Sequence, residues 1–268
     1  MASVDASPTV ALRGRARSAR QLADLVLHLT RRQLESQHRF TVLGWAWPLI
    51  RQIAQLLVFI FVFSKVLDLG IDGYGLFVFS GLIVWSWFNA GVIEATRSLE
   101  SGRHLVFSPR FPDLALPLVA VAAPVVDLLM ALPLLLALLL ADGRLEPTAL
   151  LFPLLMVGTF LLTAGLGMLT AAANVFFRDV ANVVSLALLT LFYLTPIFFG
   201  LRNIPERYQW VMHLNPLTAH VNVSRALLFD GQLPGLRDTL VVAVLSPIAA
   251  VFGLLVFRRL QPRFVDEL

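Results

Sequence analysis

Residues 114–140 read LALPLVAVAAPVVDLLMALPLLLALLL and contain one charged side chain, that of Asp127. A helix must supply about 20 apolar residues to cross the roughly 30 Å hydrocarbon core of a bilayer, and this stretch is long enough to do so. Five further stretches have a similar length and character, namely 45–67, 74–96, 148–173, 180–200 and 239–257. The sequence therefore predicts an all-α integral membrane protein with six transmembrane helices.

The composition agrees with this prediction and excludes several other classes of protein. Hydrophobic residues make up 58% of the 268 residues and charged residues 14%, with a mean hydropathy of +0.79. The chain has no cysteine, which excludes a disulfide framework, a Cys-ligated metal site and a thiol nucleophile. It has neither the H-E-x-x-H pattern of a helical zinc site nor the G-x-x-x-x-G-K-[ST] pattern of a P-loop. We expect this chain to bind no metal or cofactor of its own.

The positions of the basic residues predict the orientation. If the N-terminus is cytoplasmic, most of the 21 Lys and Arg residues fall in the segments on the inner side, as the positive-inside rule expects. Both termini are therefore predicted to be cytoplasmic. The net charge of +4 does not indicate a nucleic-acid partner, because the positive residues are spread over several loops. The charged residues that precede the first apolar run argue against a signal peptide.

The segment before the first span has the pattern of an amphipathic helix. Leu22, Leu25, Val26 and Leu29 recur at helical spacing, with charged residues on the other faces. Such a helix lies in the inner membrane interface, and both a role as a lipid anchor and one in docking a partner remain open. We accordingly divide the chain into a cytoplasmic N-terminal segment, 1–44, and a six-span domain, 45–268.

The outer segment between the fifth and sixth spans contains two short apolar stretches, 204–214 and 217–229, separated by Asn215-Pro216. Both are too short to cross a bilayer, so we predict two short outer re-entrant helices. No acidic or Cys partner accompanies His213 and His220, and we interpret both as solvent-exposed loop residues.

Two inner loops are candidates for contacts with another protein. Within the loop 97–113, a short helix with an apolar edge at Leu105, Val106 and Phe107 would suit a groove on a partner, although the edge could instead dip into the membrane interface. The turn 174–179 reads NVFFRD. It places Arg178 at the depth of the lipid phosphates and Asp179 as an N-cap of the fifth span.

Charge inside a membrane span is costly and marks candidate functional positions, and we single out Arg51, Glu94 and Asp127. Arg51 and Glu94 share a depth near the inner side, which predicts an ion pair between the first two spans. Asp127 lies in the middle of the third span without an evident partner. It is either protonated and hydrogen-bonded or faces a hydrated interior, and the sequence leaves both open.

Two tryptophans in the second span lie at an unusual depth. By count, Trp85 and Trp87 are near the middle of the membrane, whereas tryptophan usually lies at the headgroups. An indole N–H at that depth needs a hydrogen-bond partner, and aromatic faces along a hydrated path would stack on sugar rings. We therefore hypothesise that both residues line such a path.

Four stretches, in this order and with these intervals, resemble the membrane-spanning subunit of ATP-binding cassette (ABC) exporters for lipid-linked polysaccharides. This family includes the permeases that export O-antigen, capsule and teichoic acid. The stretches are RFTVLGWAWPL (39–49), NVFFRDV (174–180), YLTPIFF (193–199) and LNPLT (214–218). The resemblance runs from about Leu22 to the C-terminus. Asp127 and the Arg-rich segment 13–20 depart from the family's pattern.

The resemblance implies a homodimer in the bacterial inner membrane, bound to two copies of a separate ABC ATPase that carries the ATP and Mg²⁺. A lipid-linked glycan would pass outward between the protomers. Residues implied to couple to the ATPase are Gly102, Arg103, His104, Leu105, Phe107, Arg110, Arg178 and Asp179. Residues implied to line the path are Phe59, Phe63, Trp85, Trp87, Phe88, Phe192, Tyr193 and Phe198. The outer helices would gate the exit, with Trp210, Asn215 and Pro216 at the gate.

Two other functions remain open at this point. An ABC exporter permease for a drug, an antibiotic or a lipid would share the topology. A polytopic membrane glycosyltransferase would need clustered acidic residues or histidines at an interface. Asp68 and Asp72 form the close acidic pair on the first outer turn, and we interpret them as solvated loop residues.

Overall fold

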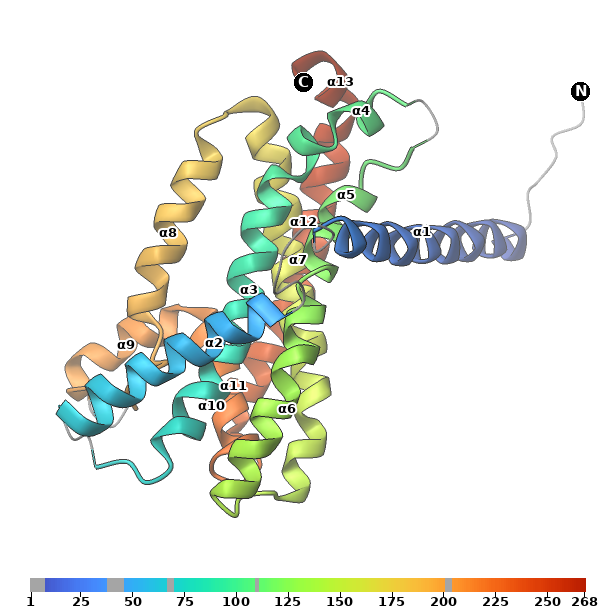
Figure 1. Cartoon of the computed structure of the whole chain (residues 1–268). Coiled ribbons are helices and arrows are strands. Elements are labelled where there is room, and N and C mark those ends of the chain that lie inside the picture. Colours follow the sequence, from blue (N-terminus) through green and yellow to red (C-terminus); the bar gives the residue numbers. More distant parts are fainter. Residues whose placement is uncertain (1–7, 38–45, 67–69, 109–110, 201–203) are drawn as a thin grey trace, which may run out of the picture.

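The computed structural model describes residues 8–37, 46–66, 70–108, 111–200 and 204–268. Within these ranges every regular element is a helix, which confirms the predicted all-α class. The helices form an elongated bundle, and one long helix, α1 (Pro8–Gln37), projects sideways from it (Figure 1). The short helix α4 (Arg103–Val106) and the C-terminus lie together at one end, which we call the α4 end. Helices α9 (Glu206–Leu214) and α10 (Pro216–Leu228) lie in the opposite half of the bundle, which we call the α10 end.

Each of the six predicted stretches is largely helical within the described residues. Among the described residues, four helical stretches are long and apolar enough to cross a membrane: Tyr74–Ser101, Ala115–Ala141, Pro147–Phe176 and Leu236–Glu267. Two shorter apolar helices, Leu49–Phe63 and Val180–Leu194, coincide with the predicted first and fifth spans. These helices make the chain an integral membrane protein by length and composition.

Several stretches are subdivided in ways that the predicted spans do not show. The first consists of α2 (Ala46–Phe59) and a π-helical segment, η1 (Ile60–Val66). The second is the single helix α3 (Tyr74–Ser101), and the third is α5 (Ala115–Ala122) followed by α6 (Val125–Ala141). The fourth begins with a 3-10 turn, η2 (Pro147–Leu151), and continues as α7 (Phe152–Phe176). The fifth is α8 (Val180–Leu194). The sixth consists of α11 (Leu236–Leu240), the π-helical η4 (Val241–Leu245) and α12 (Ser246–Leu260), followed by η5 (Gln261–Arg263) and α13 (Phe264–Glu267).

Proline accounts for two of these boundaries. Pro124 lies between α5 and α6. It interrupts the helix there, because proline has no backbone N–H for the helical hydrogen bond and its ring crowds the preceding turn. The fifth stretch was predicted to run to residue 200, but α8 ends at Leu194. Thr195 has an extended backbone and is followed by Pro196, which disfavours the helical conformation in the residue before it.

Helix α3 forms the centre of the bundle, and α5, α6, α7, α8 and α10 pack around it. Its side chains Leu76, Phe79 and Phe88 are almost fully buried. Helices α7 and α12 approach each other very closely at Gly165 and Gly253. A Cβ atom on either glycine would collide with backbone of the other helix, so this crossing requires glycine.

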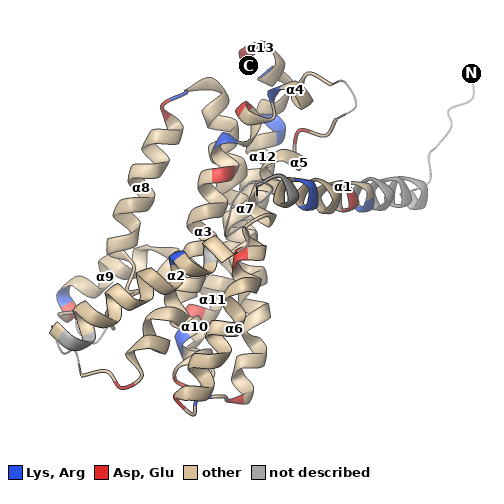
Figure 2. Ribbon diagram, viewed as in Figure 1, with Lys and Arg blue, Asp and Glu red and all other residues tan. Residues whose placement is uncertain are grey.

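The charged residues are separated from the apolar ones along the bundle. Figure 2 shows most of the Lys, Arg, Asp and Glu residues at the two ends and along α1, and only a few in the middle. This distribution is what a bundle surrounded by hydrocarbon requires. The few charged residues in the middle are therefore the place to look for function.

Candidate functional site

A cavity of about 390 Å³ lies within the bundle between α2, α3, α6 and α8. Polar side chains from all four helices gather around it, although these helices are otherwise strongly apolar. They are Arg51, Gln52, Gln55, Ser86, Asn89, Asp127 and Ser185. Polar groups inside a membrane protein are costly and face the bundle interior or water. We call this space the polar cavity and take it as the candidate site.

Gln52 is the polar group at the cavity that the protein itself leaves unsatisfied. Its side chain is 8% exposed, and its Oε1 atom accepts no hydrogen bond from the described part of the chain. A buried acceptor without a partner costs about 1–3 kcal/mol.

The structure also settles which of the charged residues lie together. Asp127 lines the polar cavity with Arg51, and its carboxylate interacts electrostatically with that of Glu94. The predicted pairing of Arg51 with Glu94 is wrong, because the described residues form no ion pair between them. The Glu94 carboxylate instead accepts a hydrogen bond from Gln33 of α1, at 3.5 Å. Arg51 lines the polar cavity together with Asn89 of α3. Glu94 instead borders a second cavity, shared with Gln33 and Arg97.

Trp85 and Trp87 both border the polar cavity but are largely packed in protein. They are 6% and 5% exposed. The indole Nε1 of Trp87 donates to the backbone oxygen of Val121, at 3.0 Å, so the predicted partner for this N–H exists. Each tryptophan therefore offers only part of its ring to the cavity, and stacking on a sugar stays a prediction.

Four of the predicted path residues form one aromatic cluster. The ring centroid of Phe198 lies 5.6 Å from that of Phe59, 5.2 Å from that of Phe63 and 5.9 Å from that of Phe192. Phe192 also lines the polar cavity, so the cluster and the cavity are continuous. These residues come from the first and fifth predicted spans and from the segment after α8. The structure thus brings together residues that are far apart in the sequence.

The remaining two path residues differ from each other. Tyr193 is 63% exposed on α8 and makes an edge-to-face contact with Phe192. Phe88 is 1% exposed and packs beside Trp85, at 6.1 Å between ring centroids. Its predicted place on the path is wrong, because this face of α3 is covered by neighbouring helices. Phe88 contributes to the core.

Buried polar side chains that the sequence analysis did not single out hold the segment that carries Phe198. Arg225 of α10 donates to the backbone oxygens of Ile197 and Phe199, and its guanidinium carbon lies 3.8 Å from the centroid of the Phe77 ring. The Tyr74 hydroxyl donates to the backbone oxygen of Phe198, at 2.8 Å. These bonds satisfy carbonyl groups of non-helical backbone, which is required at membrane depth. An arginine within the short stretch 217–229 was the signal available in the sequence.

Two of the predicted outer-gate residues have structural roles. The Asn215 side chain accepts a hydrogen bond from the Leu217 N–H, at 3.0 Å, and so caps α10. Its amide donates to Thr195 Oγ1, at 2.8 Å, and Pro216 occupies the first position of α10, where its missing N–H costs little. Trp210 is 61% exposed on α9. Gating by these residues stays a prediction.

The interpretation of His220 as a solvent-exposed loop residue is wrong. Its side chain is fully buried, with Nδ1 3.0 Å from the Pro216 backbone oxygen and Nε2 3.2 Å from Ser246 Oγ. The reason is that α10 packs against α3 and α7 instead of lying in a loop. His213 on α9 is partly exposed.

At the α4 end, the predicted coupling loop forms the short helix α4, with Arg103, His104 and Phe107 exposed and Leu105 half-buried. Its apolar edge is narrower than predicted, because Val106 is buried against the bundle. Gly102 is buried, and a Cβ atom there would lie 2.8 Å from the end of the Leu116 side chain, which would have to shift. Arg110 lies outside the described residues.

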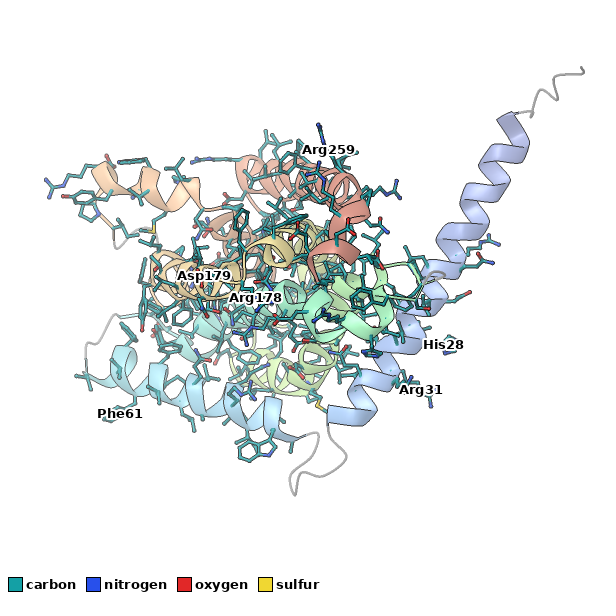
Figure 3. The ribbon with its side chains drawn as sticks, turned by 90° about the horizontal axis from the view of Figure 1, so that it is seen from above. His28, Arg31, Phe61, Arg178, Asp179 and Arg259 are labelled. Carbon is teal, nitrogen blue, oxygen red and sulfur yellow. The ribbon has the colours of Figure 1, made fainter. Side chains whose placement is uncertain are left out.

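The turn between α7 and α8 exposes Arg178 and Asp179 near the centre of the same end, as Figure 3 shows from above. Asp179 occupies the N-cap position of α8, as predicted, but its side chain makes no capping bond. The Asn174 side chain supplies one instead by accepting from the Ala181 N–H, at 3.0 Å.

The C-terminal segment, which contains Gln261 and Phe264, packs against the α4 end of the bundle. Gln261 donates to the Asp113 carboxylate, at 3.0 Å, at the point where the α4 loop enters α5. Phe264 is fully buried between Phe257 and Phe176. Burial raises the pKa of Asp113, and the hydrogen bond from Gln261 opposes this shift.

Most of the chain is similar in sequence to known transport proteins. Residues 24–229 match the ABC-2 type transporter family. An O-antigen export system permease protein, RfbA, of Klebsiella pneumoniae is 27% identical over 92% of this chain and 96% of its own length. The RfbA protein of Myxococcus xanthus has the same identity and coverage. The polysialic acid transport protein KpsM of Escherichia coli is 22% identical over 81% of this chain and 85% of its own length. Since the match spans most of the sequence, the chain belongs to the ABC-2 type transporter family.

Proposed function

We propose that this chain is the membrane-spanning permease subunit of a bacterial ABC exporter that moves a lipid-linked polysaccharide from the inner leaflet outward. The observation that carries the proposal is the similarity, over 92% of the chain, to permeases named for O-antigen export. A drug or lipid exporter would share the topology, but the relatives reported above are named for glycans. A cavity with polar walls inside an apolar bundle suits a hydroxylated cargo better than an apolar one.

In this proposal the six apolar helices cross the inner membrane, and both termini face the cytoplasm. The α4 end is then the inner side. It carries a set of basic residues that supports this orientation under the positive-inside rule: Arg97, Arg103, Arg178, Arg258, Arg259 and Arg263. Helix α8 alone is about 22 Å long, so the segment 195–200 completes its crossing. Helix α1 lies in the inner interface, and α9 and α10 are re-entrant from the outer side.

The surroundings of Arg51 support a homodimer. Its side chain is exposed on α2, in the middle of the bundle, and borders the polar cavity. A guanidinium at this depth is costly against hydrocarbon and needs water or protein beside it. A second copy facing α2 and α8 would provide both, with a path between the protomers. It would also cover the exposed apolar residues of these helices, among them Ile50, Leu57, Val58, Phe61, Val183, Leu186, Leu189 and Tyr193.

The energy for transport comes from a partner in this proposal. Two copies of a separate ABC ATPase bind ATP and Mg²⁺ and dock on the α4 end. The exposed residues of α4 and of the turn between α7 and α8 support this docking site, because they project from the bundle on its proposed inner side. The chain then acts as a transport component without enzymatic activity of its own.

Transport in inside-out membrane vesicles tests the proposal. Vesicles that contain this chain, its partner ATPase and a lipid-linked glycan are treated with a glycosidase from outside. We expect ATP to make the glycan resistant to the enzyme, because export moves it into the lumen. Vesicles in which the P-loop lysine of the ATPase is replaced are the matched control. The proposal is refuted if protection is the same without ATP, or if this chain protects the glycan without the ATPase.

A further inference from the structure

We infer that a groove between helix α1 and helices α5 and α6 binds one acyl chain of an anionic phospholipid from the inner leaflet. This inference goes beyond the proposed function. It takes from that function the place of α1 in the inner membrane interface, and it is independent of the exported cargo. It depends on the lining of the groove, on its position beside α6 and on the charge of α1.

The lining of the groove is almost wholly apolar. Its volume is about 800 Å³, and Thr30 and Arg31 are the polar residues that line it within the described part of the chain. The apolar walls include Leu22, Val26 and Leu27 of α1 and Leu118, Ala122 and Val126 of the bundle. An extended peptide would need hydrogen-bond partners for its backbone, which this lining does not offer. An acyl chain needs none, so the lining suits hydrocarbon.

The position of the groove suits a chain of the inner leaflet. Figure 1 shows α1 projecting sideways from the bundle near α5, while α6 runs from there towards the α10 end. Val126 lies in the groove, and Leu129, Leu132 and Leu136 follow it on the same face of α6 and are exposed. From Val126 to Leu136 the helix rises by about 15 Å, half of the roughly 30 Å hydrocarbon core. A chain held in the groove can therefore continue along α6 to the middle of the bilayer.

The charge of α1 favours an anionic headgroup. The helix contains six arginines and two carboxylates, those of Asp24 and Glu35. Arg31 and Arg32 are exposed near the end of the groove that Leu34 lines. Figure 3 shows Arg31 on the flank of α1 that is turned away from the bundle, towards the surrounding headgroups. Basic residues at the inner surface attract anionic lipids, so the groove should select phosphatidylglycerol over zwitterionic phosphatidylcholine.

Photo-cross-linking tests the inference on the complex with the ATPase, reconstituted in lipid nanodiscs. The probe is a trace of phosphatidylglycerol that carries a diazirine in the middle of one acyl chain. In nanodiscs of phosphatidylcholine, we expect mass spectrometry to locate adducts in peptides that cover 22–34 and 118–126. Replacing the bulk lipid by unlabelled phosphatidylglycerol should suppress these adducts about tenfold and leave those on the exposed face of α12 unchanged.

Two pairs of variants separate binding in the groove from general contact with lipid. Leu27→Trp fills the groove and should remove most of its labelling, and it spares the core because Leu27 is 69% exposed. Leu255→Trp, at a residue 61% exposed on α12, is the matched control and should leave the labelling unchanged. Arg32→Gln should reduce the preference for phosphatidylglycerol about fivefold, because a basic residue near the surface contributes about 1 kcal/mol. Arg259→Gln, an exposed arginine on α12, should not change it.

The inference is overturned if the groove is labelled no more than the α12 face, if the bulk lipid does not change its labelling, or if Leu27→Trp and Leu255→Trp behave alike. Displacement of the probe by an isoprenoid phosphate but not by phosphatidylglycerol also overturns it, because the groove would then hold the lipid of the cargo. ATP-dependent protection of glycan in vesicles is measured in parallel. Protection without labelling of the groove overturns this inference alone, whereas labelling with the expected lipid preference but without protection supports it and contradicts the proposed function.

Discussion

Replacement of Arg225 by methionine should strongly destabilise the protein. The guanidinium donates to the backbone oxygens of Ile197 and Phe199. Each oxygen left unpaired costs about 1–3 kcal/mol. The contact of the guanidinium with the Phe77 ring, at 3.8 Å, contributes about 2 kcal/mol where water is excluded.

The net effect of Arg225→Met is smaller than the sum of these contributions, because the substitution also removes the cost of burying a charge. We expect a loss of about 3 kcal/mol. For a chain of this size that corresponds to a fall in melting temperature of roughly 8 °C. Thermal unfolding of the purified protein in detergent, followed by circular dichroism, measures it.

Arg207→Met is the matched control, because Arg207 is exposed on α9 and its guanidinium lies 4.7 Å from the ring centroid of Tyr208. A surface substitution of this kind changes stability by about 0.5 kcal/mol or less. Arg225→Lys should fall between wild type and Arg225→Met, since a single ammonium group keeps the charge but loses the planar fork of donors. Equal melting temperatures for Arg225→Met and Arg207→Met would refute the role assigned to Arg225.

Three further substitutions test other parts of the structure by thermal unfolding. Trp87→Phe removes the donor to Val121 and should cost about 1–2 kcal/mol, whereas an unchanged melting temperature would speak against this hydrogen bond. Gly253→Ala places a Cβ atom against the backbone of Gly165 and should cost at least about 1–3 kcal/mol, and full stability would contradict the close crossing of α7 and α12. Asp113→Asn should stabilise the protein at pH 7–8, because burial raises the pKa of Asp113 and so penalises its charged form. Wild type is relieved of this penalty as pH falls and the carboxyl takes up a proton, so the advantage of Asp113→Asn should shrink in a pH series; an advantage that is constant with pH would contradict the assignment.

The membrane-embedded helices could be predicted from the sequence because the bilayer imposes a minimum length of apolar residues. Their internal breaks could not be predicted with the same ease. Pro124 divides the third stretch, whereas Pro133 lies inside α6 without ending it. Whether a proline interrupts a membrane helix depends on how its neighbours satisfy the freed carbonyl group. The length of an apolar run carries no information about that.

Residues of the outer segment were harder to interpret, because their environment is created by packing. His220 was interpreted as a loop residue and Arg225 was not singled out, and both become buried when α10 packs along α3 and α7. The partner of Glu94 was misidentified for a similar reason, since depth in the membrane does not show which helix lies beside it. By contrast, the hydrogen bond of Trp87 was predictable, because a buried indole N–H requires an acceptor wherever it lies.

The central claim is that a glycan passes along a wet path beside the polar cavity, and cysteine labelling tests it most directly. The chain has no cysteine, so Gln55→Cys introduces a single thiol at the cavity, and Val251→Cys introduces one on the exposed apolar face of α12. The measurement is the rate at which a charged maleimide reacts with each thiol in the complex with the ATPase. We predict fast labelling of Gln55→Cys that slows when a lipid-linked glycan is stalled in the transporter, and slow labelling of Val251→Cys. Equally slow labelling at both positions, or a rate at Gln55→Cys that the glycan does not change, would contradict the claim.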